Sequence, residues 1–175
     1  MKIIYKNISE DQVVDAFQIC RQKLGINFLS LEHFQNLTKE NKIIIATDKN
    51  FVVGFLLFDI MPEKEFFKTK KINIKGTQKK VFIFNTCAVL KECNKIGTNL
   101  FDFAIKHLSN NIDTFYCCAW EYNNNVNIEP LCLKFNFKKT LTIKNYWYYD
   151  SINKKNFCPI CNSPCTCNMI LYKKC

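Results

Sequence analysis

The feature that most constrains the fold is a change of pattern between residues 81 and 108. The run VFIFNTCAVL (81–90) is apolar and rich in β-branched and aromatic residues, which predicts a central strand. The polar turn KECNKIGTNL (91–100) follows it. Apolar residues then recur at helical spacing, at Leu100, Phe103, Ala104 and Leu108. Open α/β sheets bind ligands at the carboxyl ends of such strands, so this turn is a candidate site.

The other segments predict a mixed sheet with helices on its faces. Ser9 and Gln12 have the spacing of a capping box, and Gly25 ends the first helical pattern. A polar, Lys-rich connection covers 61–80, in which KINIKG predicts a short strand. We therefore expect an α/β fold with the element order β-α-α-β-β-β-α-β-α-β-β and a short Cys-rich C-terminal tail. Strands are predicted at 2–7, 42–48, 51–60, 81–90, 113–120 and, as a final pair, within 137–150; helices are predicted at 13–24, 31–40, 100–108 and 125–137.

Length and composition fit one domain with a hydrophobic core. The chain has 175 residues, of which 48% are hydrophobic, and this excludes disorder. No apolar run approaches the length of about 20 residues that a membrane span needs, and the N-terminus turns polar too early for a signal peptide. We expect a cytoplasmic protein without a membrane segment, either a monomer or a homodimer. Its domain would cover 1–149, with a Cys-rich, metal-binding tail at 150–175 packed on it.

Four of the eleven cysteines lie within CPICNSPCTC, near the end of the chain. The odd number of cysteines and the lack of an export signal argue against a secreted disulfide scaffold. The spacing C-x2-C-x3-C-x-C suits Zn²⁺ in a closed, structural tetrahedral site. An iron–sulfur cluster and free or redox-active thiols stay open as alternatives. The candidate ligands are Cys158, Cys161, Cys165 and Cys167.

The net charge of +10 has two interpretations. A basic surface can bind nucleic acid or another anion. However, the chain has 24 Lys, one Arg (Arg21) and 21 Asn, which is typical of an AT-rich coding sequence. A nucleic-acid surface usually carries Arg for bidentate contacts. We therefore favour a compositional origin of the charge, and nucleic acid is not the favoured partner.

The stretch NTCAVLKECNKIGTNLFDFAI (85–105), together with the element order, resembles the GNAT superfamily of acetyl-CoA-dependent N-acetyltransferases. In that family a central strand ends in a turn of the pattern Arg/Gln-x-x-Gly-x-Gly/Ala, and the following helix carries Gly-Thr-x-Leu. Residues 96–98 and Leu100 match the end of this pattern. A second family motif, an Asn that precedes a helix ending in Gly-Phe, matches Asn125 and Phe137.

The resemblance covers roughly residues 1–149 and includes departures from the family pattern. Glu92 stands where Arg or Gln is usual, and Lys95 replaces the first Gly. Asn136 replaces the Gly before Phe137. Because Asn tolerates a left-handed backbone, we expect the last exchange to be mild.

The resemblance implies that acetyl-CoA lies between the strands 81–90 and 113–120. The pantetheine arm would pair with the first strand, and the pyrophosphate would sit on amides of the turn. The residues alone favour an anion there, because the first N–H groups of a helix lack partners and Gly97 lets the backbone approach a phosphate. The implied contacts are Cys87, Ala88, Val89, Asn94, Lys95, Ile96, Gly97, Thr98 and Asn125.

The implied reaction is direct attack of a primary amine on the thioester in a ternary complex. It needs a base for the ammonium, donors for the oxyanion and an acid for the leaving thiolate. We predict Glu121 as the base and a backbone N–H near Val89 as the oxyanion donor. Cys132, which stands where the family's common catalytic Tyr would stand, is a candidate acid, and Tyr116 and Tyr122 are others. Each side chain also has a plain structural interpretation, and we hypothesise that Cys132 is not essential.

The acceptor would be a small-molecule or protein amine. If the Lys-rich 61–80 connection lies near the acceptor, it favours a neutral or acidic partner over a polycation. The alternative function is a catalytically inactive binding module that docks on RNA or protein through its basic surface and a zinc knob. A Cys–His enzyme is disfavoured because neither His33 nor His107 lies in a recognisable context.

Overall fold

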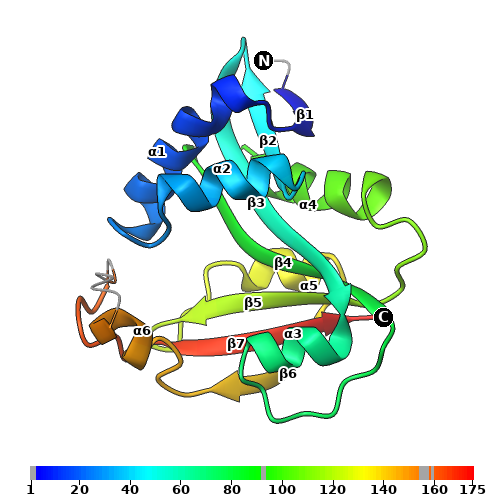
Figure 1. Cartoon of the computed structure of the whole chain (residues 1–175), viewed down its shortest axis with the longest axis vertical. Helices are drawn as coiled ribbons and strands as arrows, with labels where there is room; N and C mark the ends of the chain where they lie inside the picture. Colours follow the sequence, from blue (N-terminus) through cyan, green and yellow to red (C-terminus); the bar gives the residue numbers. More distant parts are fainter. Residues whose placement is uncertain (1–2, 92–93, 154–157, 159) are drawn as a thin grey trace.

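The computed structural model describes residues 3–91, 94–153, 158 and 160–175. Its centre is a seven-stranded mixed sheet with the strand order β1-β2-β3-β4-β5-β7-β6 (Figure 1). All neighbouring strands are antiparallel except β4 and β5, which are parallel. The predicted α/β class is therefore confirmed. The strands are β1 (Ile3–Asn7), β2 (Ile43–Asp48), β3 (Phe51–Pro62), β4 (Lys80–Val89), β5 (Phe115–Glu121), β6 (Lys138–Ile143) and β7 (Asn168–Lys174).

Helices cover both faces of the sheet (Figure 1). Buried residues of α1 and α2 pack on one face, where the Phe34 ring meets Phe55 edge to face at 5.4 Å. Buried residues of α4 pack on the other face, where Phe101 stacks on Phe84 at 4.2 Å. The helical spacing in the sequence therefore marks the buried faces correctly. The helices are α1 (Val13–Leu24), α2 (Leu31–Lys39), α3 (Glu63–Thr69), α4 (Ile96–His107), α5 (Glu129–Lys134) and α6 (Tyr148–Asn153).

Asparagine takes many of the left-handed backbone positions. Of the twelve described non-glycine residues with positive φ, nine are Asn, in a chain with only four Gly. Asn is one of the few L-residues that adopt this conformation at small cost. Asn136 has a φ of 61°, so it does occupy a left-handed position, at which the exchange of Gly for Asn is predicted to be mild.

The predicted strand at 71–76 is wrong. The 61–80 connection instead forms α3, because Phe66 and Phe67 bury their rings against Tyr116. The chain then folds back over the start of this helix. A Cβ at Gly76 would lie 2.6 Å from the Lys64 backbone nitrogen, so the return needs a glycine there.

The predicted final pair of strands within 137–150 is half wrong. β6 is present, but the chain then turns into α6, and β7 comes from residues 168–174. This strand pairs with β5 on one side and β6 on the other, and it buries Met169 to Tyr172. It is driven into the sheet by the burial of these four side chains. The cysteine-rich segment is therefore a connection between two strands of the sheet. The division of the chain at 149–150 stays a prediction.

The described helices include none with the length and apolar character that a membrane span requires.

Candidate active site

β4 and β5 diverge at their carboxyl ends. Their parallel pairing covers only Phe82 to Phe84 on β4, and it ends at the pair Phe84 and Cys117. Beyond that pair β4 continues to Val89 beside β3, and β5 continues to Glu121 beside β7. Figure 1 shows the two strands separating toward the end of α1 and toward α6. The separation leaves strand edges free to bind an extended ligand.

A cavity of about 480 Å³ occupies this divergence. Its lining comes from parts of the chain that are far apart in sequence. The end of α1 and the following loop contribute Lys23, Leu24 and Phe28, whereas α6 and its approach contribute Trp147 and Asp150. The floor is formed by residues of β4 and β5 at the point of divergence, among them Asn85, Thr86, Cys87, Cys118 and Trp120.

Asn85 Oδ1 is a polar atom of the lining that is buried without a hydrogen-bond partner among the described residues. Trp120 Nε1 is buried as well, and its N–H faces the Cys167 sulfur. Asn85 is the extra residue of a β-bulge in β4, and its Nδ2 donates to Asp59 Oδ2 at 2.7 Å. Buried polar atoms of this kind are uncommon and mark positions where a ligand or water supplies the partner. The sequence signal for Asn85 is a polar side chain within an apolar strand.

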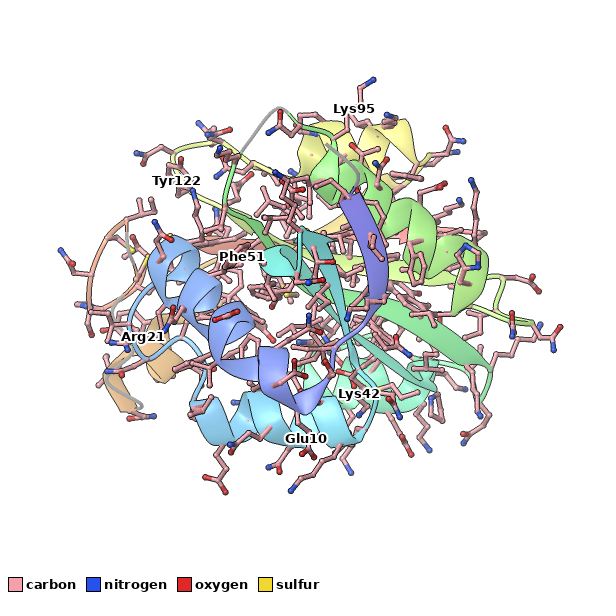
Figure 2. The ribbon with its side chains drawn as sticks, turned by 90° about the horizontal axis from the view of Figure 1, so that it is seen from above. Glu10, Arg21, Lys42, Phe51, Lys95 and Tyr122 are labelled. Atoms are coloured by element: carbon pink, nitrogen blue, oxygen red, sulfur yellow. The ribbon has the colours of Figure 1, made fainter. Side chains whose placement is uncertain are left out.

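The turn that precedes α4 lies beside the end of β4. Lys95 is the N-cap residue of α4 and has a φ of 57°, the left-handed conformation that favours glycine. This explains why the family pattern carries a glycine at that position. Figure 2 shows Lys95 at the outer edge of the molecule. The Lys95 side chain makes no capping hydrogen bond, so the first N–H groups of α4 are open to an anion.

Gly97 leaves a space at the first turn of α4. A Cβ built at Gly97 would have Cys87 Sγ at 3.9 Å and Val89 Cγ1 at 4.0 Å as its nearest neighbours, which is ordinary contact. The fold therefore does not itself require a glycine here. This is the behaviour expected of a position kept small so that a ligand can approach the backbone.

The predicted acetyl-CoA contacts fall into two adjacent groups and one more distant residue. Cys87, Ala88 and Val89 form the end of β4, and residues 94–98 form the turn and the first residues of α4. Burial raises the pKa of the Cys87 thiol to about 12, so it stays neutral. Asn125 exchanges backbone hydrogen bonds with Tyr122 after β5. Glu92 lies outside the described residues.

Of the predicted catalytic side chains, only Tyr122 lines the cavity. Glu121 points elsewhere, since its Oε2 accepts from Asn168 Nδ2 at 2.7 Å and its Oε1 lies 3.8 Å from Lys139 Nζ. Cys132 is fully buried in α5. Its hydrogen bond with Cys117, together with burial, raises the pKa of the Cys117 thiol.

Tyr116 serves a structural role, because its hydroxyl donates to Glu63 Oε1 at 2.6 Å in a buried position. The 61–80 connection lies away from the cavity. This connection precedes β4, whereas the cavity lies at the other end of that strand, and none of the connection's described residues lines it.

The sequence reasoning missed Asp150, the only carboxylate among the described lining residues, because its segment was predicted as a strand.

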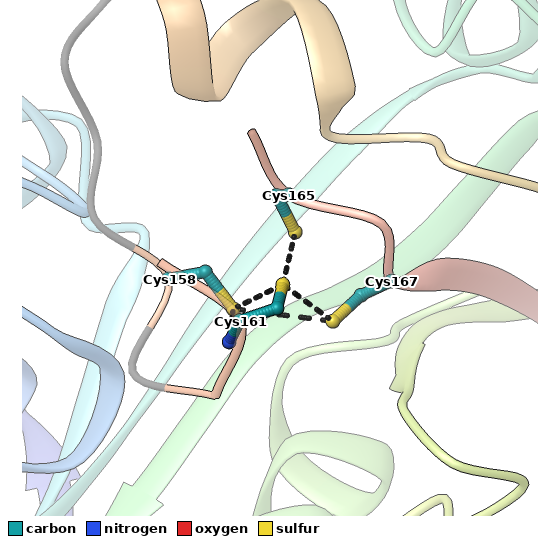
Figure 3. A group of neighbouring side chains, drawn as sticks. All are labelled: Cys158, Cys161, Cys165 and Cys167. Atoms are coloured by element: carbon teal, nitrogen blue, oxygen red, sulfur yellow. Dashed lines mark hydrogen bonds between the residues drawn. The ribbon is translucent and has the colours of Figure 1, made fainter. Parts of the chain in front are cut away.

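The four cysteines of CPICNSPCTC meet at one point beside the cavity (Figure 3). We call Cys158, Cys161, Cys165 and Cys167 the cysteine cluster. All four sulfur atoms lie within 4.8 Å of one another. The sulfur of Cys161 lies 3.4 Å from that of Cys158 and 3.6 Å from those of Cys165 and Cys167. Four sulfurs at Zn–S bonds of about 2.3 Å in a tetrahedron would lie about 3.8 Å apart, so the spacing fits one ion.

Backbone amides support the cysteine cluster. Cys158 Sγ accepts from the N–H groups of Ile160 and Cys161 at 3.4 and 3.5 Å, and Cys161 Sγ accepts from Thr166 N–H at 3.4 Å. Burial acts to raise the pKa of Cys161, but the Thr166 amide and the neighbouring thiols lower it to about 7. These donors favour the thiolate form of Cys161, whereas burial raises the pKa of the Cys165 and Cys167 thiols.

Comparison with known proteins gives a match in fold. No protein-family model matches the chain, and neither does any curated protein. The solved structure of Arabidopsis thaliana NAA60 in complex with acetyl-CoA is similar with a TM-score of 0.76 at 16% identity, over 98% of this chain and 97% of that chain. Arabidopsis thaliana Naa50 in complex with the bisubstrate analogue CoA-Ac-MVNAL gives a TM-score of 0.70 at 13% identity, over 100% and 99% of the two chains.

A GNAT-family acetyltransferase from Bacillus cereus is also similar, with a TM-score of 0.65 at 11% identity, over 99% of this chain and 97% of that chain. The chain therefore has the GNAT fold, as the sequence motifs predicted. The matches extend over nearly the whole chain, which agrees with the position of β7 inside the sheet.

Proposed function

We propose that the protein is an N-acetyltransferase that transfers the acetyl group of acetyl-CoA to a primary amine. The observation that carries this proposal is the divergence of β4 and β5 around the cavity, next to the uncapped start of α4. Similar structures with this fold contain acetyl-CoA or a bisubstrate analogue, which supports the same use of the divergence here. Fold alone does not determine function, so the site residues carry the rest.

Acetyl-CoA would use mainly backbone groups. In this proposal the pantetheine arm pairs with the free edge of β4 at Cys87, Ala88 and Val89. The pyrophosphate accepts hydrogen bonds from N–H groups of residues 94–98, where the helix dipole and Lys95 favour negative charge. Because backbone groups make these contacts, the departures from the family pattern leave them in place.

The acceptor amine would enter between the α1–α2 loop and α6. Asp150 is our proposed base, acting directly or through one water, and Glu121 is kept as a second candidate. The neutral amine attacks the thioester carbonyl, and a backbone N–H near Val89 stabilises the oxyanion. The C–N bond forms in this step. The tetrahedral intermediate then loses the excess proton on its nitrogen to water and expels the thiolate as the C–S bond breaks, and the Tyr122 hydroxyl protonates that thiolate.

The lining of the cavity indicates the acceptor class. Leu24, Phe28 and Trp147 line the cavity, together with one acidic and one basic side chain, Asp150 and Lys23. Such a site fits an amine next to an apolar group, such as the first residue of a peptide. The bisubstrate analogue in the similar Naa50 structure contains the peptide MVNAL. We propose a protein or peptide amine as the first class to test, with small-molecule amines as the second.

The cysteine cluster would hold one zinc ion with a structural role. Four thiolates leave no open coordination position, so such an ion would not act on the substrate. An iron–sulfur cluster binds its thiolates through several irons, which places the sulfurs farther apart than around one ion. The observed spacing therefore favours a single ion.

A screen of amine acceptors tests the proposed activity. Peptides with apolar first residues, lysine peptides, polyamines and simple amines are incubated with acetyl-CoA, and thiol release is followed. We expect turnover with at least one peptide, and mass spectrometry should show one added acetyl group. Failure of every acceptor, together with binding of RNA or protein, would favour the alternative of an inactive binding module.

A further inference from the structure

The cysteine cluster is part of the cavity wall. Cys158 and Cys165 line the cavity directly, and so do Trp147, Asp150 and Ser151 from the approach to α6 and from α6 itself. The same connection between β6 and β7 therefore holds the four thiols and one side of the proposed acceptor site. If the cysteine cluster becomes less ordered, that side of the proposed acceptor site therefore changes as well.

Ser151 joins α6 to the cysteine cluster. Its side chain is buried, and its hydroxyl donates to the Tyr148 carbonyl at 2.7 Å and accepts from the Cys165 amide at 2.8 Å. Its backbone carbonyl accepts from the Ser163 hydroxyl at 3.2 Å. The position of α6, and with it Asp150, is therefore tied to the loop that carries Cys165.

Both tryptophans of the chain pack on the cysteine cluster. Trp120 and Trp147 contact the cluster with Tyr122, and the two indole rings meet edge to face at 6.1 Å. Both rings also line the cavity. Trp120 comes from the divergent end of β5, so the cysteine cluster contacts the floor of the cavity as well as its wall.

The buried residues of this small core are cysteines. Cys158, Cys165 and Cys167 are its only buried members among the described residues, and the aromatic rings around them are only partly buried. Thiols alone bury little apolar area, so they contribute little to ordering a polar connection. A metal ion bound by four thiolates contributes folding free energy directly at such a site.

We propose that a thiophilic divalent metal ion, zinc, held by Cys158, Cys161, Cys165 and Cys167 builds the acceptor side of the cavity. Metal occupancy then determines acceptor binding through Ser151 and Trp147, whereas the acetyl-CoA contacts on β4 and at 94–98 keep their geometry. The assignment of this wall to the acceptor rests on the proposed function, whereas the dependence of the wall on the metal does not.

Intrinsic tryptophan fluorescence reads this dependence without any enzyme assay, because both tryptophans lie at the cysteine cluster. The full-length protein, purified without added metal, is first analysed for its metal content. A strong chelator should shift the emission to longer wavelength, and zinc should restore it at one ion per chain. Cobalt in place of zinc should give the charge-transfer absorption of thiolate ligands. Metal-free protein whose emission does not respond to zinc would overturn the proposal.

Two titrations separate the two sides of the cavity. After chelation we expect the KM for a peptide acceptor to rise about tenfold or more, while the Kd for acetyl-CoA stays within about twofold. Equal loss on both sides, or no change in acceptor KM, would overturn the acceptor-wall role. Zinc-dependent emission in a protein that does not bind acetyl-CoA would support the metal-built wall and reject the proposed function instead.

Matched variants test the hydrogen bonds of Ser151 and the proposed metal ligands. Ser151→Ala keeps all four thiols, so zinc content should stay at one per chain while the acceptor KM rises about tenfold. Ser163→Ala, which removes only the outer hydrogen bond, is its control. Cys161→Ser should lose zinc and the emission response, whereas Cys175→Ser, at an exposed cysteine outside the cluster, should keep both. Equal effects of Ser151→Ala and Ser163→Ala on the acceptor KM would contradict the role of Ser151. Equal zinc content in Cys161→Ser and Cys175→Ser would contradict the proposed metal ligands.

Discussion

The hydroxyl of Tyr116 donates a 2.6 Å hydrogen bond to Glu63 Oε1, although 53 residues separate the two in sequence. The other oxygen of Glu63 accepts from the Thr77 amide at 2.9 Å, and Lys173 Nζ lies 3.6 Å from Oε1. One carboxylate thus joins β5, β7 and the two ends of the 61–80 connection. It holds the Lys-rich connection at the end of β4 that is remote from the cavity.

Glu63→Gln should destabilise the protein without affecting acetyl-CoA binding. The variant keeps the shape of the side chain but weakens three charge-assisted contacts in a buried position. We expect a loss of about 2 kcal/mol in the free energy of unfolding at neutral pH. Urea denaturation measures it, and Glu65→Gln, on the exposed side of α3, is the control. A loss equal to that of the control would show that the Glu63 contacts contribute little.

The effect of Glu63→Gln should depend on pH. Burial acts to raise the pKa of Glu63, but hydrogen bonds from Tyr116 and Thr77, with the charge of Lys173, outweigh it and lower the pKa. A carboxyl with a lowered folded-state pKa stabilises fully above its unfolded value of about 4.3 and loses this as pH falls through the folded value. The stability difference from wild type should therefore be constant near neutral pH and shrink below about pH 4. A difference that grows on acidification would contradict this sign.

Gly97→Ala should separate stability from acetyl-CoA binding. The free protein has room for the methyl group, and alanine in a helix is more stable than glycine by about 0.5–1 kcal/mol. We expect a higher Tm and an acetyl-CoA Kd that rises about tenfold, because the methyl group stands between phosphate and backbone. Gly54→Ala is the contrasting variant. Its Cβ would lie 3.0 Å from Val89 Cγ1 and 3.1 Å from the Ala88 carbonyl oxygen, so its Tm should fall. Unchanged acetyl-CoA affinity in Gly97→Ala would exclude a phosphate at this turn.

Lys95→Gly should stabilise the protein in the absence of acetyl-CoA. The residue has a φ of 57°, and left-handed backbone costs an L-residue about 1 kcal/mol. Thermal unfolding of this variant is compared with Lys91→Gly, which removes the same charge from the same turn at a residue outside the positive-φ set. We expect a Tm increase in the first variant and a decrease in the second. The same direction in both would argue against backbone strain at Lys95.

Among variants of the candidate catalytic residues, we expect the loss of kcat to be larger where the substituted side chain lines the cavity. Tyr122→Phe should lower kcat about 100-fold with little change in acetyl-CoA Kd, because only the proton of the proposed acid is lost. Asp150→Asn should lower kcat more than Glu121→Gln, since Asp150 lines the cavity and Glu121 does not. Steady-state kinetics with the acceptor from the screen measures each effect. A larger loss in Glu121→Gln would restore the base predicted from sequence.

Cys132→Ser, at a buried residue that does not line the cavity, is the comparison for these variants. Cys132 is fully buried in α5 and contacts Cys117, so we expect lower stability but a kcat close to that of wild type. Loss of turnover with intact acetyl-CoA affinity would show that Cys132 is the acid.

The sequence predicted most elements because their signals are local. The apolar run before the turn at 91–100 and the helical spacing after it mark β4 and α4 directly. The pairing of β7 between β5 and β6 could not be read in this way, because strand order is set by burial between distant segments. The run NMILYKK looks like the end of a polar tail until its partners are known.

The sequence predicted the parts of the candidate site that backbone groups form. It missed the parts that side chains form. Motif spacing predicted the proposed acetyl-CoA contacts on β4 and on the turn before α4. It did not identify Asn85, Trp120 or Asp150, because their value depends on where the cavity opens. The cysteine spacing predicted a shared metal site, but only the fold places that site beside Trp147 and the cavity.

Isothermal titration with acetyl-CoA tests most directly whether the divergence of β4 and β5 is a cosubstrate site. We predict saturable binding of one acetyl-CoA per chain, weakened in Gly97→Ala and unchanged in Glu63→Gln. The absence of binding at high micromolar acetyl-CoA, in protein shown to be folded, would contradict the proposed acetyltransferase function.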